Sequence, residues 1–176
     1  LPRLASNEEV LRKTALWLFE RHPEMANEMA GFLKKQLARA AALSNEERTE
    51  LERQLAGFAH DLAVQQVMTD ALATEARATR WLGFDAIAGV SIKKIPGAWG
   101  KAVETELAGR DEAVTRAALN AAHTLGRAAK SKAFNAALLK LAIDSKRSAE
   151  LRLGAIAALT ELSAPLDAGV FSFLQM

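Results

Sequence analysis

The sequence predicts an all-α protein built as a stack of about five helical hairpins. Three observations carry this prediction. Half of the residues are hydrophobic, yet Tyr is absent, and Ala and Leu dominate; both favour helices, whereas β-branched and aromatic residues favour strands. A small-large residue pattern recurs along the chain. Helix caps and breaks then divide the sequence into segments of ordinary helix length.

The recurring pattern places a small residue before a large apolar one. The small residues are Ala15, Gly83, Ala118 and Ala155, and the later steps are 35 and 37 residues. The first gap, of 68 residues, predicts a divergent copy near Leu51. In three of the four clear copies an Arg stands three positions before the small residue: Arg12, Arg80 and Arg152. Such a period, with two helices per unit, is typical of a helical solenoid.

The first two predicted units span residues 7–40 and 44–74. Asn7 can cap the first helix, and Pro23 suits the first turn of the second. Ser44 followed by Glu47 is a capping box, and Asp61 can cap the partner helix. Helical apolar stripes support both units: Met25, Met29, Phe32, Leu33 and Leu37, then Val64, Val67, Met68, Ala71 and Leu72.

The remaining units span 75–109, 111–145 and 148–176. The turn of the third lies at 95–97, Ile-Pro-Gly. In the last two units the predicted caps and breaks are Asp111, Gly126, Ser131, Ser148, Pro165 and Asp167. The helix at 150–162 is apolar on nearly every side, which predicts neighbours on several sides. No flexible linker interrupts the chain, so we expect one domain over 1–176. Because it begins with Leu rather than Met, we expect a piece of a longer protein.

Three stretches carry a resemblance to a known family: 15–23 (ALWLFERHP), 50–58 (ELERQLAGF) and 95–99 (IPGAW). They resemble the HEAT-like segment of large bacterial multidomain proteins, where it lies between a sorbosone-dehydrogenase-like β-propeller and a C-terminal cytochrome c domain. The resemblance implies a right-handed α-α superhelix of the HEAT/armadillo kind. It also implies a docking or spacing role inside an exported, extracytoplasmic redox protein whose chemistry belongs to other domains.

Composition limits the partners and cofactors. The chain has 23 basic and 21 acidic residues, a net charge of +2, which argues against a nucleic-acid or anionic-membrane partner. The absence of Cys excludes disulfides, Cys-ligated clusters and covalently attached haem within this sequence. No apolar run reaches the length of a membrane span. We expect no cofactor and a protein partner, either another chain or a flanking domain.

No complete active site is visible in the sequence. The three histidines, His22, His60 and His123, lack the spacing that places two metal ligands on one helix face. His22 and His60 instead suit the C-terminal dipoles of helices. Glycine-rich phosphate loops and serine nucleophile elbows are also missing. These features predict a non-catalytic protein.

Trp17, Trp81 and Trp99 are the residues with the most functional potential. Core packing is the expected role of each, because buried Trp dominates core energetics. The alternative function is a HEAT-like DNA glycosylase, or another nucleic-acid-binding helical repeat, in which a Trp serves as a platform for a base. Trp81 and Asp85 are one turn apart, so an aromatic ring and a carboxylate can share a helix face.

Two further surfaces are candidates for binding. Basic residues recur on the second helices, which line the concave surface in HEAT-like stacks: Lys34, Lys35, Arg39, Lys101, Lys132 and Lys140. They could receive an acidic partner or phosphates, but acidic residues share those helices, which favours a mixed, solvated face. The apolar end of the chain is a possible terminal interface, through Phe171, Phe173, Leu174 and Met176. Deleting 167–176 is expected to lower thermal stability or solubility.

Overall fold

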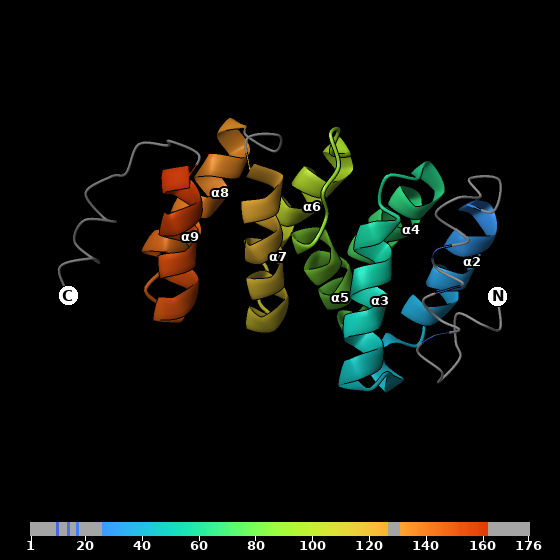
Figure 1. Cartoon of the computed structure of the whole chain (residues 1–176). Helices are drawn as coiled ribbons and strands as arrows, with labels where there is room; N and C mark the ends of the chain where they lie inside the picture. Colours follow the sequence, from blue (N-terminus) through green and yellow to red (C-terminus); the bar gives the residue numbers. More distant parts are fainter. Residues whose placement is uncertain (1–9, 11–13, 15–16, 18–25, 127–130, 162–176) are drawn as a thin grey trace.

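The computed structural model describes residues 10, 14, 17, 26–126 and 131–161. Within those residues the secondary structure is entirely helical, with no strand. The helices lie side by side along an elongated row (Figure 1). The prediction of an all-α protein is therefore confirmed.

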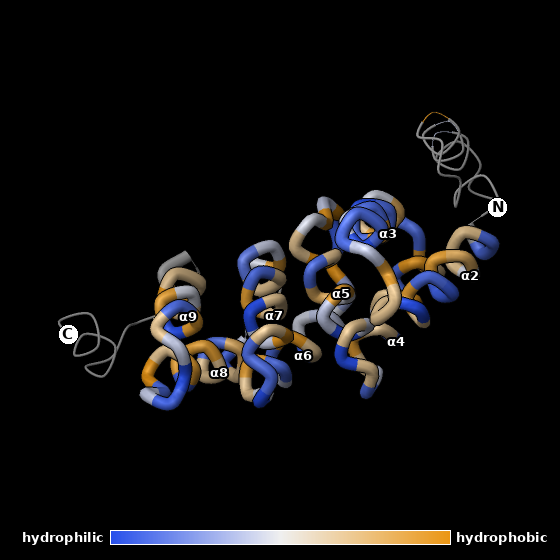
Figure 2. Tube along the Cα trace, turned by 90° about the horizontal axis from the view of Figure 1, so that it is seen from below, coloured by the Kyte–Doolittle hydropathy of each residue, from blue (hydrophilic) through white to orange (hydrophobic). Residues whose placement is uncertain are grey.

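The helices form two layers. Their bounds are α2 Ala26–Leu37, η3 Ala40–Ala42 (a 3-10 helix), α3 Asn45–Gly57, α4 Leu62–Ala73, α5 Arg77–Ala88, α6 Gly97–Glu106, α7 Glu112–Leu125, α8 Lys132–Ile143 and α9 Ala149–Glu161. One layer contains α3, α5, α7 and α9, each in contact with the next, and the other contains α2, α4, α6 and α8. Figure 2 shows these layers as two rows. We call them the first and the second layer.

Contacts between the layers join α2 to α3, α4 to α5, α6 to α7 and α8 to α9. Each of these pairs combines the second helix of one predicted unit with the first helix of the next. The connection between α4 and α5 is only residues 74–76, so these two helices stay close along their length. Helices thus alternate between the layers along the sequence, and the pairs that join the layers straddle the predicted unit boundaries.

Four of the predicted helix caps are confirmed. Ser44 and Glu47 form a complete capping box, with N–H to oxygen distances of 3.2 and 2.7 Å. Asp61 and Asp111 each accept two N–H groups of the following turn, and Ser131 accepts one. These bonds satisfy amides that a helix start leaves without partners. Gly126 ends α7 with a φ of 45°, a left-handed conformation that glycine adopts without strain.

The predicted cap at Ser148 is wrong. Its hydroxyl oxygen is buried and makes no hydrogen bond. The Ser148 N–H instead donates to the Glu112 carboxylate, 3.4 Å away on the neighbouring helix of the first layer. The start of α9 is therefore held by a contact between repeats rather than by its own cap.

The apolar core is continuous through the described helices. It extends from Met29 in α2 to Leu159 in α9. The predicted stripe of α4 is buried at every position, and Met29, Leu33 and Leu37 are buried in α2. In α9 most apolar side chains are covered as predicted, but Leu153 keeps 49% of its surface exposed. Each pair of helices is thus covered by the next, which leaves no separate cores.

The small residues of the repeat lie where helices approach closely. Gly83, Ala118 and Ala155 are all buried, as is Leu51 at the divergent position. A methyl group on Gly83 would lie 3.2 Å from Leu72 Cδ2 in α4, tighter than an ordinary contact. The absence of a side chain here lets α4 and α5 approach.

The position three residues before Gly83, Ala118 and Ala155 has a common structural role. Its side chain donates a hydrogen bond to a main-chain carbonyl at the C-terminal end of the preceding second-layer helix, whose last carbonyls lack partners within the helix. The donor and acceptor residues are Arg80 and Thr74 at 2.9 Å, Thr115 and Glu106 at 3.3 Å, and Arg152 and Ala142 at 3.0 Å. Arg80 and Arg152 of the sequence pattern are therefore helix caps, and Thr115 takes this role in the copy between them.

Candidate functional site

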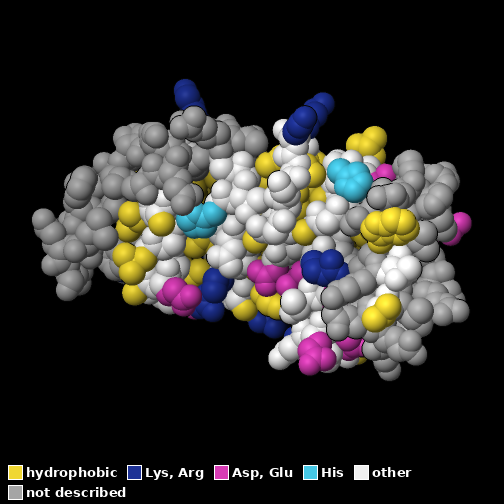
Figure 3. Space-filling model, in the orientation of Figure 1, with side chains coloured by type: hydrophobic (Ala, Val, Ile, Leu, Met, Phe, Trp, Pro, Cys, Tyr) yellow, Lys and Arg dark blue, Asp and Glu magenta, His cyan; other side chains and the backbone are white. Residues whose placement is uncertain are grey.

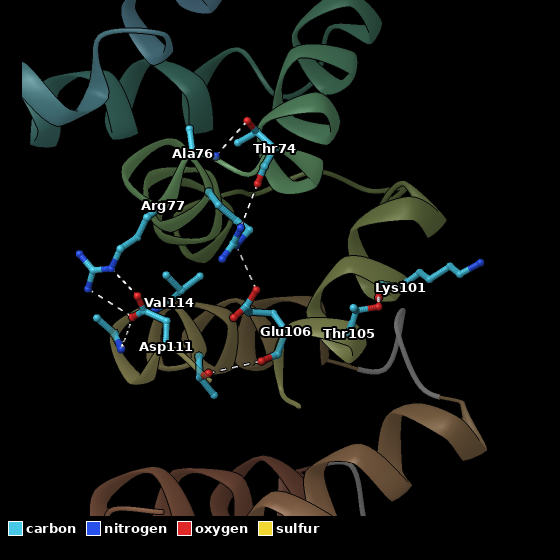
Figure 4. A network of polar contacts seen from close by, with 11 residues as sticks. Thr74, Ala76, Arg77, Lys101, Thr105, Glu106, Asp111 and Val114 are labelled. Carbon is cyan, nitrogen blue, oxygen red and sulfur yellow. Dashed lines mark hydrogen bonds and ion pairs between the residues drawn. The ribbon is translucent and has the colours of Figure 1, made fainter. Parts of the chain in front are cut away.

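A polar network joins α4, α5, α6 and α7 (Figure 4). The Arg77 guanidinium at the start of α5 pairs with the Asp111 carboxylate, which also accepts the N–H groups of Ala113 and Val114. The hydrogen bond from Arg77 is the main reason that the pKa of Asp111 is lowered. Asp111 therefore serves as both a helix cap and an anchor between repeats.

The inner part of the network is the ion pair between Arg80 and Glu106. The Arg80 Nε and Glu106 Oε2 atoms are 3.1 Å apart, although their alignment does not make a hydrogen bond. Burial raises the pKa of Glu106 and outweighs the opposing effect of Arg80. Because Arg80 also caps α4, it connects both layers.

The charged contacts between α5 and α7 recur between α7 and α9. Arg116 pairs with Glu150 at 2.9 Å, and the two partners are 34 residues apart, as are Arg77 and Asp111. Both pairs are substantially exposed, so each contributes little to stability. Their main consequence for function is that two arginines of the first layer already have acidic partners.

A groove of about 600 Å³ crosses the first layer beside these contacts. We call it the aromatic groove. Its lining comes from the segment around η3 and from α3, α5 and α7: Ala41, Arg48, Arg77, Ala78, Trp81, Asp85, Ala113, Arg116, Ala117 and Asn120. The groove therefore contains an aromatic ring, a carboxylate, an amide and three guanidinium groups above a floor of small residues.

The polar lining follows the repeat. Trp81 and Asp85 are one turn apart on α5, and Arg116 and Asn120 occupy the corresponding positions on α7, 35 residues later. On α3, Arg48 lines the same groove, and the carboxyl group of Glu52 lies near Asp85. Two successive helices, α5 and α7, thus present side-chain pairs in the same register along one side of the molecule.

Asp85 is the least compensated charge in the aromatic groove. It is partly buried, and burial raises the pKa of its carboxyl group. The pKa of Glu52 is also raised, first by burial and then by the nearby charge of Asp85, while Arg48 opposes the shift. No hydrogen bond or ion pair reaches Asp85 from the residues that the structure describes. A partly desolvated carboxylate beside an aromatic ring is typical of binding sites.

The three tryptophans differ in their environments. Trp99 is fully buried and donates its indole N–H to the Thr69 hydroxyl at 3.0 Å, so the prediction of core packing is confirmed for it. Trp81 packs against the core with one part and lines the aromatic groove with another. Trp17 is half-exposed, so core packing is wrong for that residue.

The predicted basic residues do not form one site. Lys34 and Lys35 lie in α2, Arg39 follows it, Lys101 lies in α6, and Lys132 and Lys140 lie in α8; all six are exposed. Lys140 lines a groove that is distinct from the aromatic groove. On the face shown in Figure 3, basic and acidic side chains are interspersed.

The other predicted features add no reactive centre to the described part of the chain. His60 Nδ1 lies 3.1 Å from the Gly57 carbonyl at the end of α3, as its dipole role predicts. Among the described residues there is no His, Cys, Asp and Glu group able to hold a metal ion. Their helices are also too short or too polar to cross a membrane. Residues outside the described ranges include Asn7, His22, Pro23, Met25, Pro165, Asp167, Phe171, Phe173, Leu174 and Met176.

Sequence reasoning found Trp81 and Asp85 but missed Arg48, Arg77, Arg116 and Asn120. The missing signal was the register of the repeat. Counting about 35 residues onward from Trp81 and Asp85 gives Arg116 and Asn120, which a stacked structure must bring beside them. Comparisons with protein-family models, curated protein sequences and solved structures found no match to this chain.

Proposed function

We propose that this chain is a HEAT-like α-α superhelix that acts as a non-catalytic scaffold, docking a partner protein or flanking domains of the same polypeptide. The observation that carries the proposal is the continuous core through two layers of helices. A continuous core of this kind supports an extended and rigid surface, which is what a docking scaffold needs. Following the resemblance in its sequence, we place this scaffold within a larger exported redox protein whose chemistry lies elsewhere.

The aromatic groove is the docking surface that the geometry favours. It is lined by residues of α3, α5 and α7, and the side-chain pair of α5 recurs in register on α7. A partner segment lying across α5 and α7 would therefore meet the same spacing of side chains on both helices. Trp81 supplies apolar contact area at a small cost in side-chain entropy, which is why Trp often dominates binding energy. Asp85 and Asn120 supply hydrogen-bonding specificity.

Charge balance in this groove supports a protein partner over a nucleic acid. The lining has three arginines and one aspartate. However, Arg77 is paired with Asp111, Arg116 with Glu150, and Arg48 lies near Glu52. The surface is therefore close to neutral overall, whereas phosphate recognition needs unpaired cations.

Site-specific photo-crosslinking in the full-length protein tests the docking role. A benzophenone amino acid replaces Asn120 in the aromatic groove or, as the matched control, Glu104 on the second-layer helix α6. We expect position 120 to crosslink to residues outside 1–176 or to a second chain, and Trp81→Ala to reduce that yield. A folded protein whose position 120 gives no such crosslink would rule out docking through this groove.

The second candidate function is nucleic-acid binding of the glycosylase type. It is favoured by one observation, namely that Trp81, Asp85 and three arginines line the same groove. The test is a titration of labelled duplex DNA at about 50 and about 200 mM salt, because each phosphate contact contributes a slope of about −0.9 in log–log form. Salt-dependent binding that Arg48→Ala weakens, but the second-layer control Lys101→Ala does not, would support it. Absence of salt-dependent binding at micromolar protein would eliminate it.

A further inference from the structure

A second groove, of about 660 Å³, lies at the junction of α8 with the connections before α7 and before α9. We call it the basic groove. Leu107 and Leu141 are buried beneath it, and Ala137 is partly exposed. Around them lie Arg110, Lys140, Lys146 and Arg147, with the acidic residues Glu112 and Asp144. The groove thus combines an apolar floor with a mostly cationic rim.

The two acidic residues are already engaged within the chain. The Glu112 carboxylate accepts the Ser148 N–H at 3.4 Å. Asp144 accepts the Lys146 N–H at 3.0 Å and forms a 3.7 Å ion pair with Arg147. Arg147 in turn donates to the Gly109 carbonyl. Asp144 and Arg147 therefore offset each other while they hold the connections together, and the remaining rim carries three cations against the single carboxylate of Glu112.

Arg110, Lys140 and Lys146 are these other cations. All three are exposed, or nearly so, and none forms an ion pair with the residues that the structure describes. They come from three different segments of the chain, namely the connection before α7, helix α8 and the connection before α9. Their convergence on one groove is a product of the tertiary structure.

Interactions with helix ends account for Lys140 but not for Arg110 and Lys146. The carbonyls of Val103, Thr105 and Glu106 at the end of α6 already accept the N–H groups that follow them. The last turn of α8 contains Lys140, which interacts favourably with the helix dipole. Arg110 and Lys146 lie beyond the ends of these helices. Their side chains are therefore available to a ligand.

We propose that the basic groove binds an acidic segment of a partner protein, in which apolar side chains alternate with carboxylates. Carboxylates would meet the rim cations, and apolar side chains would cover the accessible alanine surface of the floor, namely Ala108, Ala136 and Ala137. A phosphate or a nucleic-acid backbone would leave this floor uncovered, which is why we favour a peptide. This inference extends the docking role proposed above to a different surface with a specific partner chemistry.

Peptide binding with charge-reversed variants tests the inference. The probe is a fluorescein-labelled peptide of alternating Glu and Leu, measured by anisotropy at about 150 mM salt, where the Debye length is about 8 Å. The double variant Lys140→Glu/Lys146→Glu is expected to bind about 10-fold or more weakly, since two favourable contacts become repulsive. The matched control is Lys101→Glu/Lys132→Glu, which changes the net charge equally outside the groove and should change binding by about 2-fold or less.

Three further arms make the outcome decisive. A Lys-Leu peptide should bind the Lys140→Glu/Lys146→Glu variant more tightly than the unaltered protein. A Glu-Gly peptide, which lacks apolar side chains, should bind at least about 10-fold more weakly than the Glu-Leu peptide. Equal losses in both double variants, or equal binding of the Glu-Gly peptide, would overturn the proposal. So would competition by inorganic phosphate at equimolar concentration. Crosslinking at Asn120 reports on the other layer, so either proposal can fail alone.

Discussion

The close contact between α7 and α9 can be tested with one added methyl group. A Cβ atom on Gly154 would lie 2.6 Å from Leu119 Cδ2, far inside van der Waals contact. Leu119 is buried, with 4% of its surface exposed, so its side chain has little room to move. Gly31 is the matched control, because it is also inside a helix and its added Cβ would contact nothing within 4 Å.

The expected magnitudes follow from two opposing effects. Replacing Gly by Ala inside a helix favours folding by about 1 kcal/mol. Overpacking a close contact costs about 1–3 kcal/mol. Gly31→Ala should therefore raise the free energy of unfolding by about 1 kcal/mol, whereas Gly154→Ala should leave it unchanged or lower it by up to about 2 kcal/mol.

Urea unfolding followed by circular dichroism measures both variants. A double-mutant cycle with Leu119→Val gives the sharper result, because the shorter side chain vacates the space that the new methyl group needs. We expect the two substitutions to be coupled favourably by about 1 kcal/mol. If Gly154→Ala stabilises the protein as much as Gly31→Ala, or if the cycle shows no coupling, the packing of α9 on α7 is wrong.

Other substitutions test caps, core and charge. Trp99→Phe should lower the free energy of unfolding by about 1–2 kcal/mol, since the Thr69 hydroxyl oxygen loses the indole N–H that it accepts and keeps only its bond to the Gln65 carbonyl. A urea midpoint equal to that of the unaltered protein would contradict this. Ser44→Ala should lower the free energy of unfolding by about 1 kcal/mol through loss of the capping box. Ser148→Ala should not destabilise the protein, because the buried Ser148 hydroxyl makes no hydrogen bond. Equal losses of melting temperature in the two variants would contradict this difference. Because the pKa of Asp85 is raised above its ordinary value of 3.8, its ionised form opposes folding, and this cost grows as pH rises. Asp85→Asn should therefore raise the melting temperature at pH 7, and the gain should vanish as pH falls below about 3.8; a gain that persists in acid would refute the electrostatic cause.

Much of the helical order was readable from the sequence because its causes are local. Ser44, Asp61, Asp111 and Ser131 bond to amides only two or three residues away, so their role depends on the adjacent sequence alone. The apolar stripe of α4 was predictable for a similar reason, since helical spacing determines which side chains share a face. Ser148 shows the limit: its N–H is bonded to a residue on another helix, which outweighs the local preference.

The candidate sites were less predictable because their parts are far apart in sequence. Trp81 and Asp85 share one helix and were identifiable as a pair, but Arg48 and Asn120 reach the aromatic groove from other helices. Lys140 was a candidate because basic residues recur on the predicted second helices. Its neighbours Arg110 and Lys146 became relevant only once the connections before α7 and α9 were placed beside α8.

By itself, the sequence determined that the chain is helical, where four of its helices are capped and that its small-large pattern recurs at a period of about 35 residues. Tertiary structure decided which helices pair most closely, which of the tryptophans is buried, and which charges are compensated. The physical reason is one of range. Helix propensity and capping act over a few residues, whereas burial and ion pairing depend on side chains that only packing brings within a few ångströms of each other.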